Sequence, residues 1–192
     1  MLNAINGIAY IVDREGIIHF AGGSEWDSFS SDNAAFLPAS DLNGFNLFDL
    51  IEGSAVRKAH KAIHERVLSG RANLTFEYRC DAPDRERLMR MALGPIVVSG
   101  AVAAVLYHST MVSTLSRVPL DYLANDAALR RYRALAQLPV VTVCAWCADV
   151  SIAAEQWFKP DEYYRRGGVA DVQLSHAICP SCADQVVAPL VT

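Results

Sequence analysis

Four of the five cysteines in this 192-residue chain form two Cys-x-x-Cys pairs near its C-terminal end. The pairs are Cys144–Cys147 and Cys179–Cys182, and the segment between them has room for a small helix or hairpin. Zinc binds four thiolate or imidazole ligands in a tetrahedron, and a Cys-x-x-Cys turn presents two sulfurs to the same side of such a site. The two turns therefore predict one metal centre, with zinc as the expected ion.

A fifth candidate ligand, His176, stands three residues before the second pair. It could replace one cysteine, or it could hydrogen-bond to a ligand sulfur or to the backbone from outside the site. Paired thiols or disulfides without a metal are the remaining alternative. A site of four cysteines leaves no position for water, so the sequence favours a structural centre over a catalytic one.

No catalytic motif accompanies the cysteines. The chain has no glycine-rich phosphate loop, no Gly-x-Ser-x-Gly elbow and no metalloprotease helix motif. The His-x-Glu motif that zinc deaminases place ahead of Pro-Cys-x-x-Cys is also missing. These absences predict a protein that is not an enzyme.

Composition limits the remaining classes. Hydrophobic residues make up 52% of the chain and the mean hydropathy is +0.17, which predicts a packed core in one domain with an appendage or in two small domains. No apolar run approaches the length of a membrane-spanning helix, and the N-terminus lacks the features of a signal peptide. We therefore expect a cytoplasmic protein with reduced thiols and no membrane contact. The net charge of −4 makes nucleic acid an unlikely partner.

Hydrophobic periodicity predicts the elements that must position the cysteines. The β-branched and aromatic runs predict five strands, and the longer helical patterns predict two helices. The strands are expected at residues 8–12, 17–20, 74–80, 88–98 and 102–112, and the helices at residues 54–68 and 121–137. Short turns between the last three strands indicate an antiparallel meander.

The helix at residues 54–68 carries two histidines. Ser54 is a plausible N-cap and Gly70 a plausible stop. His60 falls on the apolar stripe, and His64 lies one turn further on, nearer its edge. A histidine on such a face is usually a packed core residue, and a ligand-binding role is the alternative.

The order of two strands, short helices, one long helix and three strands resembles a PAS domain, an α+β fold. The resemblance covers roughly residues 5–113 and is carried by two runs: Ile11-Val12-Asp13-Arg14-Glu15-Gly16-Ile17-Ile18 and Asn43-Gly44-Phe45-Asn46-Leu47-Phe48-Asp49-Leu50-Ile51. It implies a five-stranded antiparallel sheet with flanking helices around a ligand cavity. We expect this PAS-like sensor domain at residues 1–113, a connecting helix at 114–138 and a small zinc-stapled module at 139–192.

The C-terminal run Ser175-His176-Ala177-Ile178-Cys179-Pro180-Ser181-Cys182, with the first cysteine pair, resembles a short module of bacterial signalling proteins that often follows PAS or receiver domains. This resemblance covers residues 139–184. Relatives tend to carry basic residues after the first pair, where this chain has Ala148-Asp149-Val150. No output domain follows, so we expect a signal to leave through contact with another protein.

Together these resemblances imply a bacterial, non-enzymatic PAS-type sensor or interaction protein that relays a ligand or redox input. Its partner would be an unknown signalling protein, and a homodimer could form through the PAS domain. Haem-binding PAS sensors place a histidine on their longest helix, which implies His60 as a haem ligand in one alternative. In the other alternative the cavity is filled by side chains and the protein is an adaptor.

Overall fold

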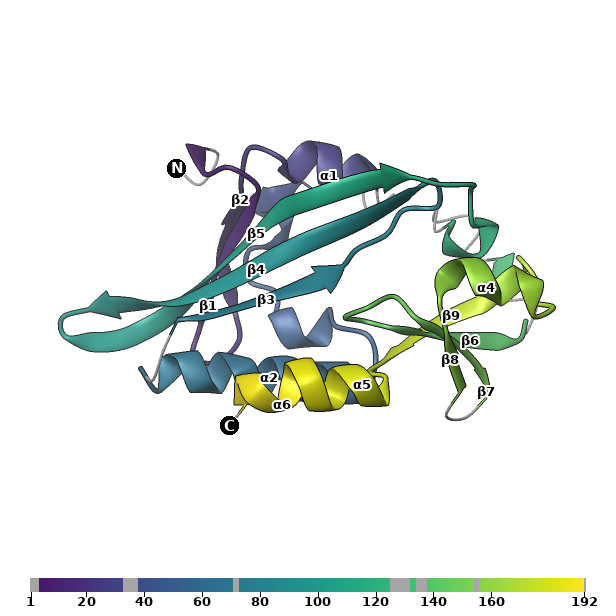
Figure 1. The fold of residues 1–192 in the computed structure, drawn as a ribbon. Coiled ribbons are helices and arrows are strands. Elements are labelled where there is room, and N and C mark those ends of the chain that lie inside the picture. The colour runs from purple at the N-terminus through teal and green to yellow at the C-terminus, as the bar shows by residue number, and fades with distance from the viewer. Residues whose placement is uncertain are drawn as a thin grey trace.

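The computed structural model describes residues 4–32, 38–70, 73–124, 132–133, 138–153 and 156–191. Its larger sheet has the strand order β2-β1-β5-β4-β3, and every pair of neighbours is antiparallel. The strands are β1 (Ile8–Asp13), β2 (Ile18–Gly22), β3 (Leu74–Arg79), β4 (Arg85–Val98) and β5 (Ala101–Ser116). Helices flank this sheet (Figure 1), so the predicted PAS-like α+β fold is confirmed.

Two helices and two short 3₁₀ turns lie between β2 and β3. They are α1 (Trp26–Asp32), η2 (Ala39–Leu42), η3 (Leu47–Asp49) and α2 (Ser54–Leu68). The helix α2 runs below the sheet in Figure 1 and buries Val56, Ile63 and Val67 against it. The helix spans the predicted residues, but the prediction of Ser54 as its N-cap was wrong, because Gly53, at a φ of 83°, is the N-cap and Ser54 is already helical. The helix ends at Leu68, two residues before Gly70 at a φ of 70°. Glycine adopts this left-handed region without a Cβ penalty.

Strands β4 and β5 form a hairpin that extends beyond the rest of the sheet (Figure 1). Ser99 and Gly100 connect them, and both have positive φ angles, as a two-residue type I′ turn requires. The hairpin is longer than the sequence predicted, because β5 continues to Ser116 rather than ending at 112. The predicted domain boundary at residue 113 thus falls inside a strand.

A second sheet follows, with the order β8-β7-β6-β9. Its elements are β6 (Val140–Cys144), β7 (Val150–Ala153), β8 (Gln156–Phe158), the helix α4 (Pro160–Arg165) and β9 (Gln173–Ala177). It has a small core of its own, formed by Leu120, Tyr122, Val141, Val150, Tyr163 and Val172. The pairing of β6 with β9 is parallel.

The predicted connecting helix at 121–137 lies mostly outside the described residues. The described part contains the 3₁₀ turn η4 (Asp121–Leu123) and two helical residues, 132 and 133. Arg133 is buried and donates hydrogen bonds to the carbonyl oxygens of Asp121, Ala124 and Ala170. One side chain therefore ties this connection to the second sheet.

The chain ends in a helix that the sequence analysis did not predict. It is one continuous segment of α5 (Pro180–Cys182), a π-helical stretch η5 (Ala183–Val187) and α6 (Ala188–Val191), and it lies beside α2 in Figure 1. Pro189 has no N–H and its ring would clash with the preceding turn, which accounts for the wider π-helical turns before it. Arg66 of α2 donates to the carbonyl oxygen of Pro189 at 2.6 Å.

Candidate metal centre and the residues around it

The four cysteines of the two pairs come together in one cluster. Their sulfur atoms all lie within 4.8 Å of one another, and the Sγ atoms of Cys147 and Cys179 are 3.7 Å apart. Cys144, Cys179 and Cys182 are buried, whereas Cys147 is partly exposed. All are free thiols, as is the fifth cysteine, Cys80, which stands apart from the cluster.

The parallel pairing of β6 with β9 explains how distant motifs meet. Cys144 is the last residue of β6 and pairs with Ala177, the last residue of β9. Each Cys-x-x-Cys turn therefore leaves the same end of two neighbouring strands. The amide of Ala145 also donates to the carbonyl oxygen of Ala177 at 2.9 Å, which holds the turns side by side.

The first turn is closed by backbone hydrogen bonds. The amide of Ala148 donates to the carbonyl oxygen of Cys144 at 3.0 Å, and the amide of Cys144 donates to that of Asp149 at 2.8 Å. Ala148 has a φ of 62°, a left-handed conformation that non-glycine residues rarely adopt. The carboxylate of Asp149 pairs with the ammonium group of Lys159 at 2.9 Å, so a positive charge from another segment lies beside the first turn.

The second turn is also the start of the C-terminal helix. Cys179 occupies the N-cap position, its sulfur accepts a hydrogen bond from the amide of Cys182 at 3.4 Å, and Pro180 takes the first helical position. Proline is favoured there because its missing N–H would have no partner. The Cys-Pro-x-Cys sequence thus places one thiol of the cluster at a helix cap.

The thiols interact strongly with one another. A hydrogen bond with Cys147 lowers the pKa of Cys144 to about 5, and the same bond raises the pKa of Cys147. Burial raises the pKa of Cys182 to about 12. Without a cation the cluster therefore favours a thiolate shared among neighbouring thiols, and ionising all four requires a compensating positive charge.

The geometry fits a zinc ion. Zinc–sulfur bonds of about 2.3 Å in a tetrahedron give sulfur–sulfur edges of about 3.8 Å. The Sγ atoms of Cys147 and Cys179 are 3.7 Å apart, and all four sulfurs lie within 4.8 Å of one another. Cys144 also accepts from the amide of Cys179 at 3.4 Å, the kind of second interaction that orients a metal ligand. Four clustered cysteines could thus hold one metal ion.

His176, the alternative ligand, is not part of the cysteine cluster. Its Nδ1 lies 3.2 Å from the carboxylate of Glu52, just before α2. Its carbonyl oxygen would lie 2.2 Å from a Cβ placed on Gly53, so only glycine permits this approach. His176 therefore lies at the junction between β9 and α2, and the compact cluster consists of the four cysteines.

Trp146 links the cysteine turn to the larger sheet. It stands between Cys144 and Cys147, is only 3% exposed, and belongs to the same core as the inner face of the PAS-like sheet. Its ring lies 5.3 Å from that of His60 on α2 and 6.0 Å from that of Phe76 on β3. The amide of Arg79 donates to the carbonyl oxygen of Trp146 at 2.7 Å. The cysteine cluster is thus built into the core of the larger sheet.

The two histidines of α2 have different surroundings. His64, expected nearer the edge of the stripe, is almost fully buried: its Nδ1 lies 2.9 Å from the hydroxyl of Tyr107 and its Nε2 lies 2.9 Å from the carbonyl oxygen of Asp13. His60 is half-buried, and its nitrogens have no hydrogen-bond partner among the described residues. Burial lowers the pKa of His60 to about 4, so its ring is neutral at pH 7.

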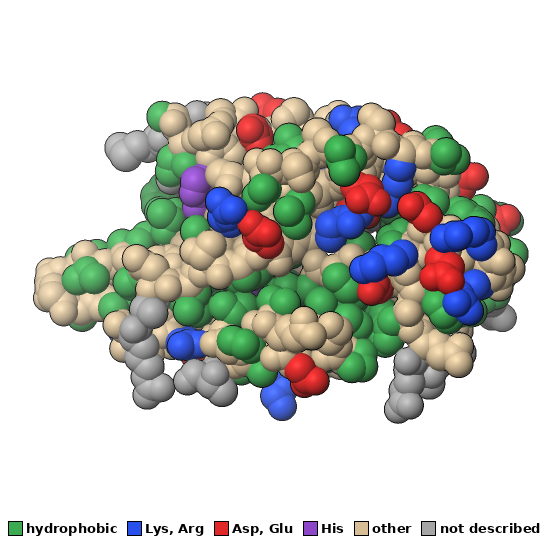
Figure 2. All heavy atoms as spheres, in the orientation of Figure 1, with side chains coloured by type: hydrophobic (Ala, Val, Ile, Leu, Met, Phe, Trp, Pro, Cys, Tyr) green, Lys and Arg blue, Asp and Glu red, His purple; other side chains and the backbone are tan. Residues whose placement is uncertain are grey.

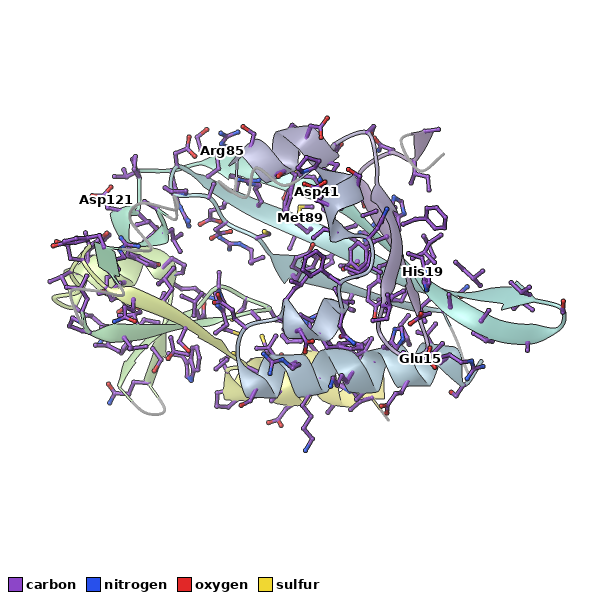
Figure 3. All side chains as sticks on the ribbon, turned by 180° about the vertical axis from the view of Figure 1, so that it is seen from behind. Glu15, His19, Asp41, Arg85, Met89 and Asp121 are labelled. Carbon is purple, nitrogen blue, oxygen red and sulfur yellow. The ribbon has the colours of Figure 1, made fainter. Side chains whose placement is uncertain are left out.

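A pocket lies between α1 and the inner face of β4 and β5. It has a volume of 240 Å³ and is lined mainly by Phe29, Arg87, Met89 and Met111. Figure 3 shows Met89 near the middle of the molecule and Arg85 toward the end of the sheet that faces Asp121. The interior of the PAS-like sheet therefore opens toward α1.

Sequence reasoning found the cysteines but missed Trp146 as a core residue and Gly53 as a point of contact. A tryptophan between two cysteine ligands carries no periodicity that would assign it to a face. The helix cap could have been found, because cysteine followed by proline is compatible with N-cap and first-turn preferences.

No protein-family model and no curated protein matches this chain. Solved structures do match. A sensory box sensor histidine kinase from Vibrio cholerae has 14% identity and a TM-score of 0.44, and the match covers 58% of this chain and 86% of that chain. The PAS domain of Bordetella pertussis BvgS has 14% identity and a TM-score of 0.46, with 71% and 91% covered.

A third match is Vibrio cholerae VqmA in a complex with ligand and DNA, at 12% identity and a TM-score of 0.46. It covers 57% of this chain and 48% of VqmA, so the present chain spans about half the length of that protein. None of the three TM-scores reaches 0.5, so the fold assignment rests on the strand order and flanking helices. Within the described residues, no helix is both long and apolar enough to cross a bilayer.

Proposed function

We propose that this chain is a non-enzymatic, cytoplasmic signalling protein in which a PAS-type sheet receives an input and a structural zinc centre stabilises the element that passes it on. The observation that carries the proposal is the position of Trp146. It lies between two thiols of the cluster and packs on α2 and β3 inside the larger core. A change in that core must move the cysteine turn or lose this contact.

Zinc is proposed as a structural ion because the four thiols already supply a full tetrahedral set. When bound, it would neutralise thiolates that could not otherwise be ionised together. Cys144 and Cys179 would then hold the ends of β6 and β9 together, and Cys179 starts the C-terminal helix.

That helix is the proposed output. Its buried side includes Cys182 and Leu190, while Asp184, Gln185 and Pro189 are exposed beside α2. A movement of Trp146 would reach the helix through the cysteine cluster, where Cys179 is the cap. The exposed side could then change its contact with a signalling partner or with a second copy of the chain.

Metal analysis and hydrogen exchange test this function. The purified chain should contain about one zinc ion, and a chelator should remove amide protection from residues 180–191 and from the facing side of α2. Adding zinc back should restore the protection of these amides from hydrogen exchange. A protein that binds no metal, or whose C-terminal helix keeps its protection without zinc, would contradict the proposal.

Haem binding by His60 is the second candidate function. The neutral ring with unbonded nitrogens favours it, whereas the stacked Trp146 occupies one face of the imidazole. An absorption spectrum tests whether His60 binds haem. Protein produced with ample haem should show a Soret band, and this band should be lost in His60→Ala. Colourless protein would exclude haem, and the adaptor alternative would gain support if the interior also bound no other small molecule.

A further inference from the structure

The four thiols of the cysteine cluster are not equally exposed. Cys144, Cys179 and Cys182 are 1%, 2% and 7% exposed, whereas Cys147 keeps a larger part of its surface uncovered. A buried structural cysteine is inert, but a thiolate that solutes can reach is open to oxidation. Cys147 is therefore the thiol at which a solute from the surrounding water can react with the cluster.

The surface beside Cys147 is polar. Asp149, two residues further on, pairs with Lys159 at 2.9 Å, and the side chain of Lys159 is 73% exposed. Figure 2 shows charged side chains gathered over the smaller sheet, next to hydrophobic ones between the larger sheet and the C-terminal helix. Trp146, one residue before Cys147, is buried in the core. A small polar solute can therefore reach Cys147 without entering that core.

Cys179 is a second thiol within reach of Cys147. Their Sγ atoms are 3.7 Å apart and a disulfide bond is about 2.0 Å long, so the two sulfurs have to approach by about 1.7 Å. The remaining cysteine, Cys80, lies outside the cluster and cannot supply the second sulfur. The geometry thus favours a bond between the two Cys-x-x-Cys turns.

Backbone hydrogen bonds hold the two turns independently of their sulfurs. The amide of Ala145 donates to the carbonyl oxygen of Ala177 at 2.9 Å, which joins one turn to the strand that leads into the other. The amide of Ala148 donates to the carbonyl oxygen of Cys144 at 3.0 Å and closes the first turn. These bonds keep the sulfurs adjacent while their bonding changes, so a small local movement is enough to join them.

We propose that Cys147 is a site of reversible oxidation by peroxide, and that the oxidised Cys147 forms a disulfide with Cys179 at the expense of metal binding. The inference rests on the proposed zinc centre and names a chemical input that acts on it directly.

The reaction uses one molecule of hydrogen peroxide for each disulfide. The thiolate of Cys147 attacks one peroxide oxygen, the O–O bond breaks, hydroxide leaves, and Cys147 becomes a sulfenic acid. The thiolate of Cys179 then attacks the sulfur of Cys147, the S–O bond breaks and a second hydroxide leaves. The two sulfurs lose two electrons to the two oxygens, and each hydroxide takes a proton from solvent to become water.

The disulfide removes two of the four ligands. Cys144 and Cys182 remain, and two thiolates do not complete a tetrahedral zinc site. These two cysteines take up protons as the ion departs, because thiolates without the ion are not stable together. Oxidation of one exposed thiol therefore empties the whole centre.

The disulfide also joins the two segments on which the proposed output depends. Cys147 follows Trp146, whose ring packs on α2 and β3, and Cys179 is the N-cap of the C-terminal helix. A shift of one sulfur toward the other moves the first turn relative to the start of that helix. Oxidation thus acts on the connection between the larger sheet and the C-terminal helix.

The test treats the zinc-loaded full chain with hydrogen peroxide and follows two products. A chromogenic chelator measures the zinc released, and mass spectrometry of an alkylated, non-reduced tryptic digest maps the disulfide. Trypsin cleaves after Arg133 and Arg165 but not before Pro160, so the first cysteine pair lies in peptide 134–165 and the second in a peptide that ends at residue 192. A disulfide between the turns therefore links two peptides, whereas a disulfide within one turn links none.

We expect linked peptides in an amount equal to the released zinc, and fragmentation of the linked pair should assign the bond to Cys147 and Cys179. A thiol reductant should break the link and restore zinc binding, because a disulfide is reversible whereas more highly oxidised sulfur is not.

Cys147→His removes the exposed thiol and keeps a metal ligand, because three cysteines and one histidine form a common structural zinc site. This variant should release zinc to peroxide at least about tenfold more slowly than the parent chain and give no linked peptides. Cys182→His is the matched control, since it replaces a buried thiol by the same side chain. It should release zinc and form the link at the parent rate, as should Cys80→Ser.

The proposal is overturned if peroxide releases no zinc, if the disulfides lie within the turns, or if Cys147→His releases zinc as fast as the parent chain. Should a histidine variant fail to bind zinc, the digest of the parent chain decides alone. Failure of this proposal leaves the structural zinc centre standing. A chain that binds no zinc removes the proposed function instead, and its digest still shows whether peroxide links Cys147 to Cys179.

Discussion

The two sheets of this molecule are stabilised in different ways. The larger sheet is made of antiparallel neighbours with strands of up to 16 residues, and its long hairpin closes through a two-residue turn. The smaller sheet has strands of three to five residues and one parallel pair. Strands in globular proteins usually have five or six residues, so these strands are at the short end of the range. We therefore expect the larger sheet to keep its fold without the metal, whereas the smaller one, despite its small core, should need the cysteine cluster and its contact with α2.

Breaking the cysteine cluster should have the largest effect. In Cys179→Ser the cluster loses a thiolate, and a serine hydroxyl is a poor zinc ligand even though it can cap a helix. We expect loss of zinc, loss of amide protection in the smaller sheet and the C-terminal helix, and a decrease of at least about 3 kcal/mol in the free energy of unfolding. Metal analysis with hydrogen exchange measures this effect region by region.

Cys80→Ser is the matched control, because Cys80 is a half-buried thiol on the edge of the larger sheet and outside the cluster. It should keep zinc and change the free energy of unfolding by less than about 1 kcal/mol. Retained zinc and protection in Cys179→Ser, or equal losses in both variants, would show that the cluster does not hold the smaller sheet.

The same contrast explains what the sequence could predict. The strands near residues 8–12 and 74–80 and the helix from Ser54 were found because their signals are local: alternation, a helical stripe, and glycines at the ends. The smaller sheet was missed because three to five residues carry too little periodicity, and a parallel pair such as Val143 with His176 joins distant segments. The cysteines were found from their spacing, since two turns of this type need no knowledge of the strands that bring them together.

His60 and His64 show where periodicity stops being informative. The helical stripe predicted that both histidines lie near the core and that His60 is the more deeply buried of the two. In the structure His64 is the buried residue, and it has two hydrogen-bond partners. The difference comes from Tyr107 on β5 and from the carbonyl oxygen of Asp13 on β1, which no pattern within the helix reveals.

Replacing each histidine by phenylalanine sharpens the comparison within the larger sheet. His64→Phe would leave the hydroxyl of Tyr107 and the carbonyl oxygen of Asp13 buried without a partner. We expect it to lower the free energy of unfolding by about 2–3 kcal/mol. His60→Phe breaks no hydrogen bond and should change it by less than about 1 kcal/mol at pH 7.5. Urea denaturation of the two zinc-loaded variants measures both values.

Acid gives an independent check on His60. Its folded pKa of about 4 lies below the unfolded value of 6.5, so the unfolded chain binds the proton first as the pH falls. The stabilisation is complete above pH 6.5 and is lost between 6.5 and 4. His60→Phe should therefore lose less stability over this window than the parent chain, whereas identical pH profiles would show that the folded protein does not desolvate the imidazole ring.

The smallest expected effect comes from two residues in the left-handed region, one in each part of the molecule. Ser99 is exposed at the hairpin turn with a φ of 51°, and Ala148 is buried beside the cysteines with a φ of 62°. Glycine removes the Cβ strain at both positions, but it also loses a buried methyl group at Ala148. Ser99→Gly should therefore raise the free energy of unfolding by about 0.5 kcal/mol, and Ala148→Gly should leave it nearly unchanged. Thermal melting measures the stability of both variants, and competition with a chelator measures their affinity for zinc.

A zinc affinity that falls more than about tenfold in Ala148→Gly would contradict this expectation. The methyl group of Ala148, rather than the backbone angle, would then position the first turn. The smaller sheet would in that case depend on side-chain packing at a turn whose geometry its backbone hydrogen bonds now explain.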